Sequence, residues 1–280
     1  MSRPRRSALY VPADNARALE KARGLDVDVL ILDLEDAVAP EAKAQARAAL
    51  ADAVAALRGS REIVIRVNGP DTPQSVDDLK AAVKARPDAI LLPKVDGPDD
   101  IEAVAALAGS IPLWAMVETT CAVLNLADIA RAGVQALVLG ANDLLKETGG
   151  RHRGDRANLQ YVMTQMVLVA RAYGIAALDG VHNSINDDAG LSAACEQARD
   201  FGFDGKTLIH PSQIAPCHAA FVPSEDEIAA AKRVLTAFAE EPGKGALLLD
   251  GRMVEKLDAD IAERLIARAR MHPGDESVQQ

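Results

Sequence analysis

Short apolar runs alternate along the chain with longer stretches that have helical periodicity. Several of the runs are apolar throughout, which is typical of strands covered on both faces. Residues 40–57 and 98–109 have the 3.6-residue period of helices. Such an alternation of strands and helices predicts parallel βαβ units. The runs occupy residues 7–11, 28–34, 62–67, 89–93, 112–118, 136–140, 175–181 and 206–211.

Eight such runs predict an α/β fold, a (β/α)8 TIM barrel, over residues 1–240, close to the usual length of about 250 residues. A doubly wound open sheet is the alternative, but the first strand is not followed by a GxGxxG motif. Residues 241–280 form a predicted C-terminal extension, a short hairpin followed by an amphipathic helix. Its apolar stripe needs a partner surface, which we expect on a neighbouring subunit. The stripe consists of Val254, Leu257, Ile261, Leu265 and Ile266.

Polar residues follow most of the predicted strands, where the active site of a barrel is expected. Glu118 follows the fifth strand and Asp143 the sixth, so adjacent strands would present them side by side. Two carboxylates at that distance repel each other unless a cation lies between them, and Mg²⁺ prefers oxygen ligands. A helix cap or a salt bridge is the alternative for each of these acids.

The stretch LILDLEDAV (30–38) carries three acids in an otherwise apolar strand. Buried acids are rare without a partner or a metal. Arg66, at the end of the next strand, can form an ion pair with these acids and also stabilise an oxyanion. One acid is therefore expected to brace Arg66, and another to orient a metal-bound water. The acids are Asp33, Glu35 and Asp36.

Composition narrows the possible functions. The formal net charge of −10 argues against an extended nucleic-acid surface. No apolar run reaches the roughly 18 residues of a membrane span, and none follows the basic N-terminus as in a signal peptide. Three scattered cysteines suit a reducing cytoplasm, with the thiols used as small core residues. We therefore expect a cytoplasmic protein with a small-molecule substrate.

Several motifs together resemble the CitE-like branch of the HpcH/HpaI aldolases, which includes the citrate lyase β subunit, malyl-CoA and citramalyl-CoA lyases and related thioesterases. The resemblance covers residues 6–235, and the order and spacing of the motifs carry it. They are LYVPADNARALEKA, LDLEDAVAPEAKAQAR, IRVN, LPKV, MVETT, LGANDL and GFDGKTLIHPSQI.

The resemblance implies roles for five of the strand-end residues. Glu118 and Asp143 match the family's Mg²⁺ ligands, and Arg66 matches the arginine that contacts the thioester carbonyl. Glu35 and Asp36 match the acidic pair that supports the metal-bound waters and the arginine. We therefore expect Arg66, Glu35 and Asp36 to be catalytic.

Three further residues fall at positions that the family uses for substrate and catalysis. Tyr10 and Lys21 stand where relatives contact coenzyme A, although Lys21 also fits an ordinary exposed helix lysine. Relatives often carry an aspartate in the tail that reaches a neighbouring subunit's site. Glu255 stands at that position here, and it keeps the acid with one more methylene.

The resemblance implies a Mg²⁺-dependent lyase that cleaves a carbon–carbon bond of a 3-hydroxyacyl-CoA. Malyl-, citramalyl- and hydroxymethylglutaryl-CoA are the candidate substrates, with a 2-oxo acid or an acetoacetate-type product and an acyl-CoA as products. Three alternatives stay open: an acyl-CoA thioesterase, a citrate lyase β subunit acting on a carrier-protein thioester, and a non-catalytic barrel. The family also implies a homo-oligomer, a trimer or a hexamer.

Overall fold

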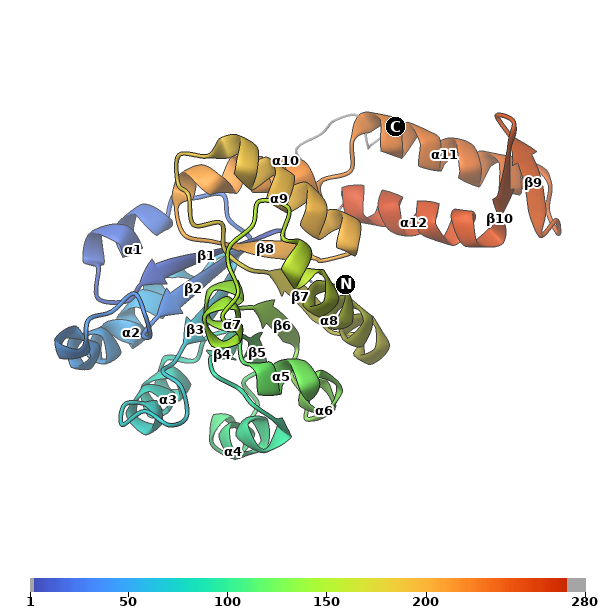
Figure 1. Ribbon diagram of the computed structural model, residues 1–280. Helices are drawn as coiled ribbons and strands as arrows, with labels where there is room; N and C mark the ends of the chain where they lie inside the picture. Colours follow the sequence, from blue (N-terminus) through green and yellow to red (C-terminus); the bar gives the residue numbers. More distant parts are fainter. Residues whose placement is uncertain (1–2, 271–280) are drawn as a thin grey trace. The chain divides into compact units, whose positions relative to one another are not determined.

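The computed structural model describes residues 3–270, and the chain divides into two compact units, Met1–His218 and Ala219–Gln280. In the first unit, eight parallel strands close into a barrel, because β1 pairs with both β2 and β8 (Figure 1). The predicted (β/α)8 TIM barrel is confirmed. The strands are β1 (Ser7–Pro12), β2 (Val29–Asp33), β3 (Glu62–Arg66), β4 (Ala89–Leu92), β5 (Leu113–Val117), β6 (Ala136–Leu139), β7 (Ala176–Asp179) and β8 (Gly205–Leu208).

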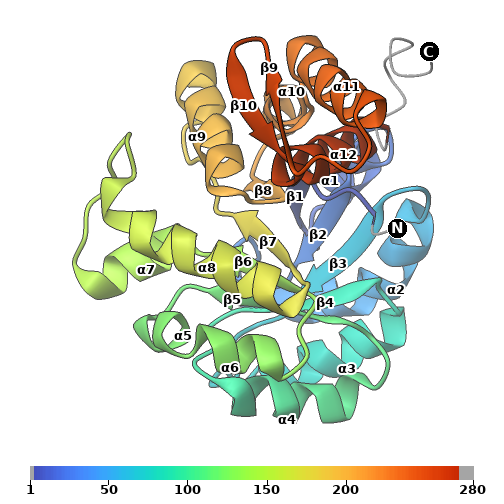
Figure 2. The same cartoon turned by 90° about the vertical axis from the view of Figure 1, so that its right-hand side faces the viewer.

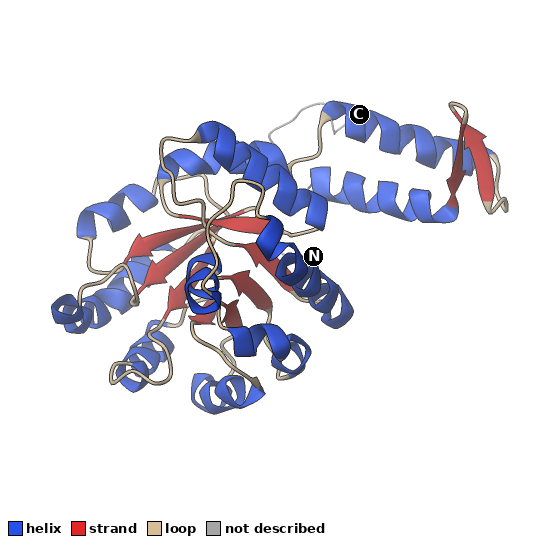
Figure 3. Ribbon diagram, in the orientation of Figure 1, coloured by secondary structure: helices blue, strands red, loops and turns tan. Residues whose placement is uncertain are grey.

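Helices surround the barrel strands and connect each strand to the next (Figures 2 and 3). The helices of this part of the chain are α1 (Ala16–Ala22), α2 (Lys43–Leu57), α3 (Ser75–Ala85), α4 (Pro98–Ala108), α5 (Thr120–Leu124), α6 (Leu126–Arg131), α7 (Ala141–Thr148), α8 (Gln160–Tyr173), α9 (Asp188–Phe201) and α10 (Ile214–Phe221). Short 3₁₀ turns η1 (Pro40–Ala42), η2 (Ala157–Leu159) and η3 (Pro211–Gln213) precede α2, α8 and α10.

The core has an inner and an outer layer, because successive strand residues point to opposite faces. In β2, Val29 and Ile31 belong to the cluster that fills the barrel, whereas Leu30 and Leu32 are equally buried outside that cluster. Both faces are therefore covered, which explains why the strands read as continuous apolar runs. The inner cluster consists of Ala8, Val29, Ile31, Val64, Ala89, Leu91, Trp114, Met116, Ala136, Val138 and Leu178.

The strand register places polar residues together at the carboxyl ends of the strands. Asp33 is the last residue of β2 and pairs in register with Arg66, the last residue of β3. Glu118 follows β5 directly, and Asp143 lies in the first turn of α7, just after β6. The barrel closure therefore brings side chains from β2, β3, β5 and β6 to one mouth.

The C-terminal unit consists of two helices joined by a hairpin, which Figure 3 shows in blue and red. Helix α11 (Glu225–Glu240) lies alongside α12 (Lys256–Arg270), and β9 (Ala246–Leu249) pairs with β10 (Arg252–Glu255). Helix α11 groups with this unit, although it lies within residues 1–240, the predicted barrel domain. Packing of the extension on a neighbouring subunit stays a prediction. The two helices share a small apolar core of Ile228, Ala231, Ala262, Ile266 and Ala269.

The predicted apolar stripe of the extension is only partly correct. Val254 lies in strand β10 and is buried, so it is not part of the helix. Ile266 is buried in the unit's own core, and Leu265 packs against that core. Leu257 and Ile261 are 65% and 54% exposed. The helix therefore uses half of its apolar face within its own unit.

Two remaining sequence predictions concern the cysteines and the membrane. Cys195 and Cys217 are buried free thiols, as expected of small core residues, but Cys121 is exposed. The prediction was wrong for Cys121 because the short helix α5 turns that side chain to solvent. Within residues 3–270, the structure contains no helix with the length and hydrophobicity that a membrane crossing requires.

Candidate active site

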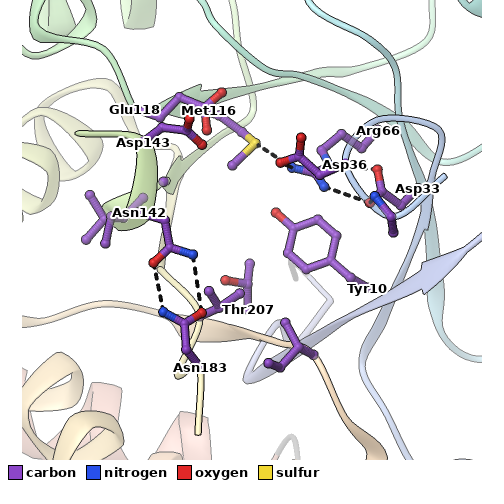
Figure 4. Close-up of a pocket in the computed structure, with 16 residues that line it drawn as sticks. Tyr10, Asp33, Asp36, Arg66, Met116, Glu118, Asn142, Asp143, Asn183 and Thr207 are labelled. Atoms are coloured by element: carbon purple, nitrogen blue, oxygen red, sulfur yellow. Dashed lines mark hydrogen bonds and ion pairs between the residues drawn. The ribbon is translucent and has the colours of Figure 1, made fainter. Parts of the chain in front are cut away.

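A pocket of about 280 Å³ lies at the carboxyl ends of the barrel strands (Figure 4). Six of the residues singled out from the sequence line it, and they come from five of the barrel strands or the turns that follow them. They are Tyr10, Asp33, Asp36, Arg66, Glu118 and Asp143. The other lining residues are Ala37, Met116, Leu139, Gly140, Ala141, Asn142, Val181, Asn183, Thr207 and Ile209.

Arg66 is fixed on one side of the pocket by Asp33. The Asp33 carboxylate accepts hydrogen bonds from Arg66 Nε at 2.8 Å and from a terminal nitrogen at 2.7 Å. It also accepts the backbone N–H groups of Glu35, at 2.9 Å, and Ala37, at 3.2 Å. The Asp33 side chain is fully buried. Two parallel hydrogen bonds from one guanidinium to one carboxylate fix the plane of the guanidinium. Asp33 is therefore the acid that braces Arg66.

Glu35 and Asp36 lie in the turn after β2 and approach Arg66 unequally. A Glu35 carboxylate oxygen lies 2.7 Å from Arg66 Nη1, whereas the nearest Asp36 oxygen is 3.8 Å away. Asp36 is 72% exposed on the pocket side, and Glu35 is buried. The predicted acidic pair is therefore split into a buried partner of the arginine and a solvent-facing carboxylate.

Burial raises the pKa of Glu35 to about 8, although the charge of Arg66 acts in the opposite direction. The guanidinium already has a carboxylate partner in Asp33, so Glu35 is the second acid beside one cation. Neighbouring Asp36 and Glu118 raise the Glu35 pKa further. A neutral Glu35 near pH 7 can donate a proton.

This pKa predicts a pH-dependent contribution to stability. The pKa of a glutamate in the unfolded chain is about 4.3. Because the pKa of Glu35 is higher in the folded protein, its contribution to the free energy of unfolding is fully present below about pH 4.3. That contribution is lost as the pH rises through about 8. We expect the free energy of unfolding to fall between about pH 5 and about pH 8.5 in the wild type more than in Glu35→Gln. Urea denaturation of both proteins at the two pH values measures this. Identical pH dependence would contradict the assignment.

Tyr10 supports the arginine from the β1 side. The Arg66 guanidinium carbon lies 4.7 Å from the centre of the Tyr10 ring, within the range of a cation–π contact. Burial raises the pKa of the Tyr10 hydroxyl, which therefore stays protonated. Lys21, the other predicted coenzyme A contact, is exposed on α1 and does not line this pocket. Both coenzyme A roles stay predictions.

Glu118 and Asp143 converge on one positive charge, the ammonium of Lys94. Lys94 Nζ lies 3.3 Å from Glu118 and 2.8 Å from Asp143, and the Lys94 backbone N–H donates to Glu118 Oε1 at 2.8 Å. Glu118 is 1% exposed, and its burial raises the pKa of the carboxyl despite Lys94. Gly140 makes room for Glu118, because a Cβ there would lie 2.5 Å from Oε2.

The convergence of two carboxylates on a single cation fits a divalent metal site. Mg²⁺ in proteins is usually bound by one or two carboxylates and keeps several waters. Within residues 3–270, no three His, Cys, Asp or Glu side chains form a metal-binding group, so the remaining ligands would be water or substrate. Glu118 and Asp143 therefore fit Mg²⁺, and the ligand assignment stays a proposal.

A buried polar network holds the turn that carries Glu35 and Asp36. Lys43 Nζ donates to the carbonyl oxygens of Leu34 and Glu35, both at 2.8 Å, and to Asn68 Oδ1 at 2.7 Å. Lys43 was not among the residues predicted from the sequence. A signal was present, because Lys43 shares its helical spacing with Ala46, Leu50, Val54 and Leu57, the buried face of α2.

The remaining polar residues form the rim or lie elsewhere. Asn142 and Asn183 exchange two amide hydrogen bonds, of 3.2 and 2.9 Å, across the pocket mouth. His210 caps η3 by accepting the Ser212 backbone N–H at 3.2 Å. Glu255 is exposed on β10 of the C-terminal unit, and its catalytic role stays a prediction.

Residues 6–211 match the HpcH/HpaI aldolase/citrate lyase family. The chain belongs to this family. It is 48% identical over 270 residues to a (3S)-malyl-CoA thioesterase from Cereibacter sphaeroides, with 95% of each sequence covered. It is 32% identical over 286 residues to citrate lyase subunit beta of Escherichia coli, with 96% of this chain and 95% of the relative covered.

A solved structure agrees with this assignment. CitE from Mycobacterium tuberculosis, in complex with magnesium, acetoacetate and coenzyme A, matches with a TM-score of 0.82 and 33% identity. The match covers 95% of this chain and 98% of that chain. The predicted resemblance to the CitE-like branch is confirmed, and the chain is a member of a family of enzymes that includes CoA-linked lyases.

Proposed function

We propose that the chain is a Mg²⁺-dependent enzyme that hydrolyses the thioester of a malyl-CoA-type 3-hydroxyacyl-CoA. The observation that carries the proposal is the fixed Arg66 guanidinium, which shares one pocket with the Glu118–Asp143 pair (Figure 4). The 48% identity to a (3S)-malyl-CoA thioesterase over almost the whole chain supports hydrolysis. Magnesium and coenzyme A in the related CitE structure support the cofactor and the carrier.

Glu118 and Asp143 would hold Mg²⁺, which would supply a Lewis acid to the bound substrate. Arg66 stabilises the negative charge that develops on the thioester oxygen when water attacks the carbonyl carbon. Asp36, an exposed carboxylate on the pocket wall, accepts a proton from that water. A carbon–oxygen bond forms, the carbon–sulfur bond breaks, and the proton ends on the sulfur of coenzyme A.

Carbon–carbon cleavage of the same substrate is the second candidate, and Glu35 favours it. Cleavage begins with transfer of the hydroxyl proton to the Asp36 carboxylate, the carbon–carbon bond breaks, and the products are a 2-oxo acid and the enolate of an acyl-CoA. Arg66 would stabilise the enolate oxygen. Glu35, with its pKa raised to about 8, lies against Arg66 and does not line the pocket, so its proton would reach the enolate carbon through a group on the pocket wall. The relation to citrate lyase subunit beta supports this reaction.

Mass spectrometry of the products distinguishes the two reactions. The purified chain is incubated with Mg²⁺ and malyl-, citramalyl- or 3-hydroxy-3-methylglutaryl-CoA, with EDTA and Glu118→Ala as controls. We expect malyl-CoA to give free coenzyme A and the intact hydroxy acid. Neither product should form with EDTA or with the Glu118→Ala variant. A shortened acyl-CoA with an oxo acid would assign the lyase reaction instead. If all substrates stay intact, carrier-protein thioesters test a citrate lyase subunit, and their failure would leave a non-catalytic barrel.

We also propose that the protein is a cytoplasmic homo-oligomer, a trimer or a hexamer. The C-terminal unit exposes large apolar side chains that a second copy of the chain would cover. They are Leu248, Met253, Leu257 and Ile261, between 54% and 80% exposed. Light scattering at micromolar concentration is expected to give a trimer or a multiple of it. A monomer would contradict the proposal.

A further inference from the structure

Lys94 has an unusual backbone conformation beside the pocket. It follows β4 by two residues and has a φ of +53°, in the left-handed region that non-glycine residues rarely adopt. Gly69 makes space for it, because a Cβ at position 69 would lie 3.2 Å from Lys94 Cγ. A strained residue persists only where its surroundings hold it, and such residues gather at functional sites.

The contacts of Lys94 explain what holds it there. Its backbone N–H and its ammonium both contact Glu118 Oε1, and the ammonium also contacts Asp143. Glu118 is buried, so an unpaired negative charge at this position would be costly. The ammonium compensates the two carboxylates that would bind the metal.

An ammonium and a divalent cation cannot occupy the same position between two carboxylates, because like charges at that distance repel strongly. The Lys94 side chain is 38% exposed, so it has solvent into which it can move. We propose that Lys94 is a built-in cation that keeps Glu118 and Asp143 together in the metal-free protein and is exchanged for the divalent metal. This inference rests on the proposed metal-dependent function.

The exchange has a measurable consequence. Because metal binding must displace the ammonium from both carboxylates, Lys94 lowers the affinity of the site for the metal. The opposite expectation applies if Lys94 stays on Glu118 and orients it as a ligand. In that case removing the side chain would weaken metal binding.

Titration of the metal-free protein with Mn²⁺, followed by electron paramagnetic resonance, separates these two cases without measuring turnover. Mn²⁺ prefers the same oxygen ligands as Mg²⁺. We expect Lys94→Met to bind Mn²⁺ about tenfold more tightly than the wild type. Lys94→Gly should do the same, and it also relieves the positive φ if the methionine variant folds poorly. Lys146→Met, which removes an exposed lysine from the same helix as Asp143, is the matched control and should leave the affinity unchanged.

Thermal unfolding in EDTA gives a second measurement. Lys94→Met should unfold at a lower temperature than the wild type, and saturating Mn²⁺ should remove this difference. Unchanged or weaker Mn²⁺ binding in both Lys94 variants would overturn the exchange. If the wild type nevertheless shows Mg²⁺-dependent turnover, only the role of Lys94 fails. If neither the wild type nor the Lys94 variants bind Mn²⁺, the metal-dependent function fails with it.

Discussion

Replacing Glu118 with glutamine is expected to lower kcat by about a thousandfold, which corresponds to a loss of several kcal/mol of transition-state stabilisation. Glutamine has nearly the same size, so it fills the buried space beside Gly140 and still accepts the Lys94 backbone N–H. It lacks the negative charge that a divalent cation requires. The fold should therefore persist while metal binding and catalysis are lost.

Steady-state kinetics with Mg²⁺ and Mn²⁺ titration of the same preparation test this expectation together. Glu102→Gln, an equivalent change at an exposed position on α4, is the matched control and should retain wild-type kcat. A Glu118→Gln enzyme with wild-type kcat would remove Glu118 from the proposed metal ligands. Loss of activity with unchanged Mn²⁺ affinity would place its role elsewhere in the reaction.

Replacing Arg66 with methionine is expected to lower kcat by about 10²- to 10³-fold with a smaller change in KM, because the guanidinium acts on charge that develops in the transition state. The same change should cost about 3–5 kcal/mol of stability, since it leaves the Asp33 carboxylate buried without its cation. Kinetics and urea denaturation measure the two effects separately.

The double variant Asp33→Asn/Arg66→Met separates catalysis from stability. Removing the Asp33 charge takes away the main unpaired acid, so much of the lost stability should return. Activity should not return, because the cation is still missing. Recovery of kcat in the double variant would show that Arg66 acts only by neutralising Asp33, and a change confined to KM would exclude a role in the transition state.

The barrel was predictable because its signal is local and repeated. Every strand observed in the barrel begins and ends within three residues of its predicted run, since a strand buried on both faces must be apolar along its whole length. The positions of Arg66, Glu118 and Asp143 followed from the same pattern, because parallel strands in a barrel present their carboxyl ends at one mouth.

The partners of these residues were less accessible to sequence reasoning. Asp33, Glu35 and Asp36 were identified as a group, but only the β2–β3 register shows that Asp33 forms the bidentate pair and that Asp36 faces solvent. Lys43 and Lys94 are single lysines whose contacts are separated by 8 to 49 residues along the chain. Their roles depend on which surfaces face each other after the barrel closes.

The sequence by itself determined the barrel, its membership of a family of CoA-linked enzymes, and the strand ends that carry the chemistry. Those properties follow from periodicity and motif order, which are local features of the sequence. The tertiary structure decided that Asp33 holds Arg66, that burial keeps Glu35 neutral near pH 7, and that Lys94 lies between Glu118 and Asp143. These properties depend on distance and desolvation, which exist only once strands far apart in sequence have been brought to one mouth.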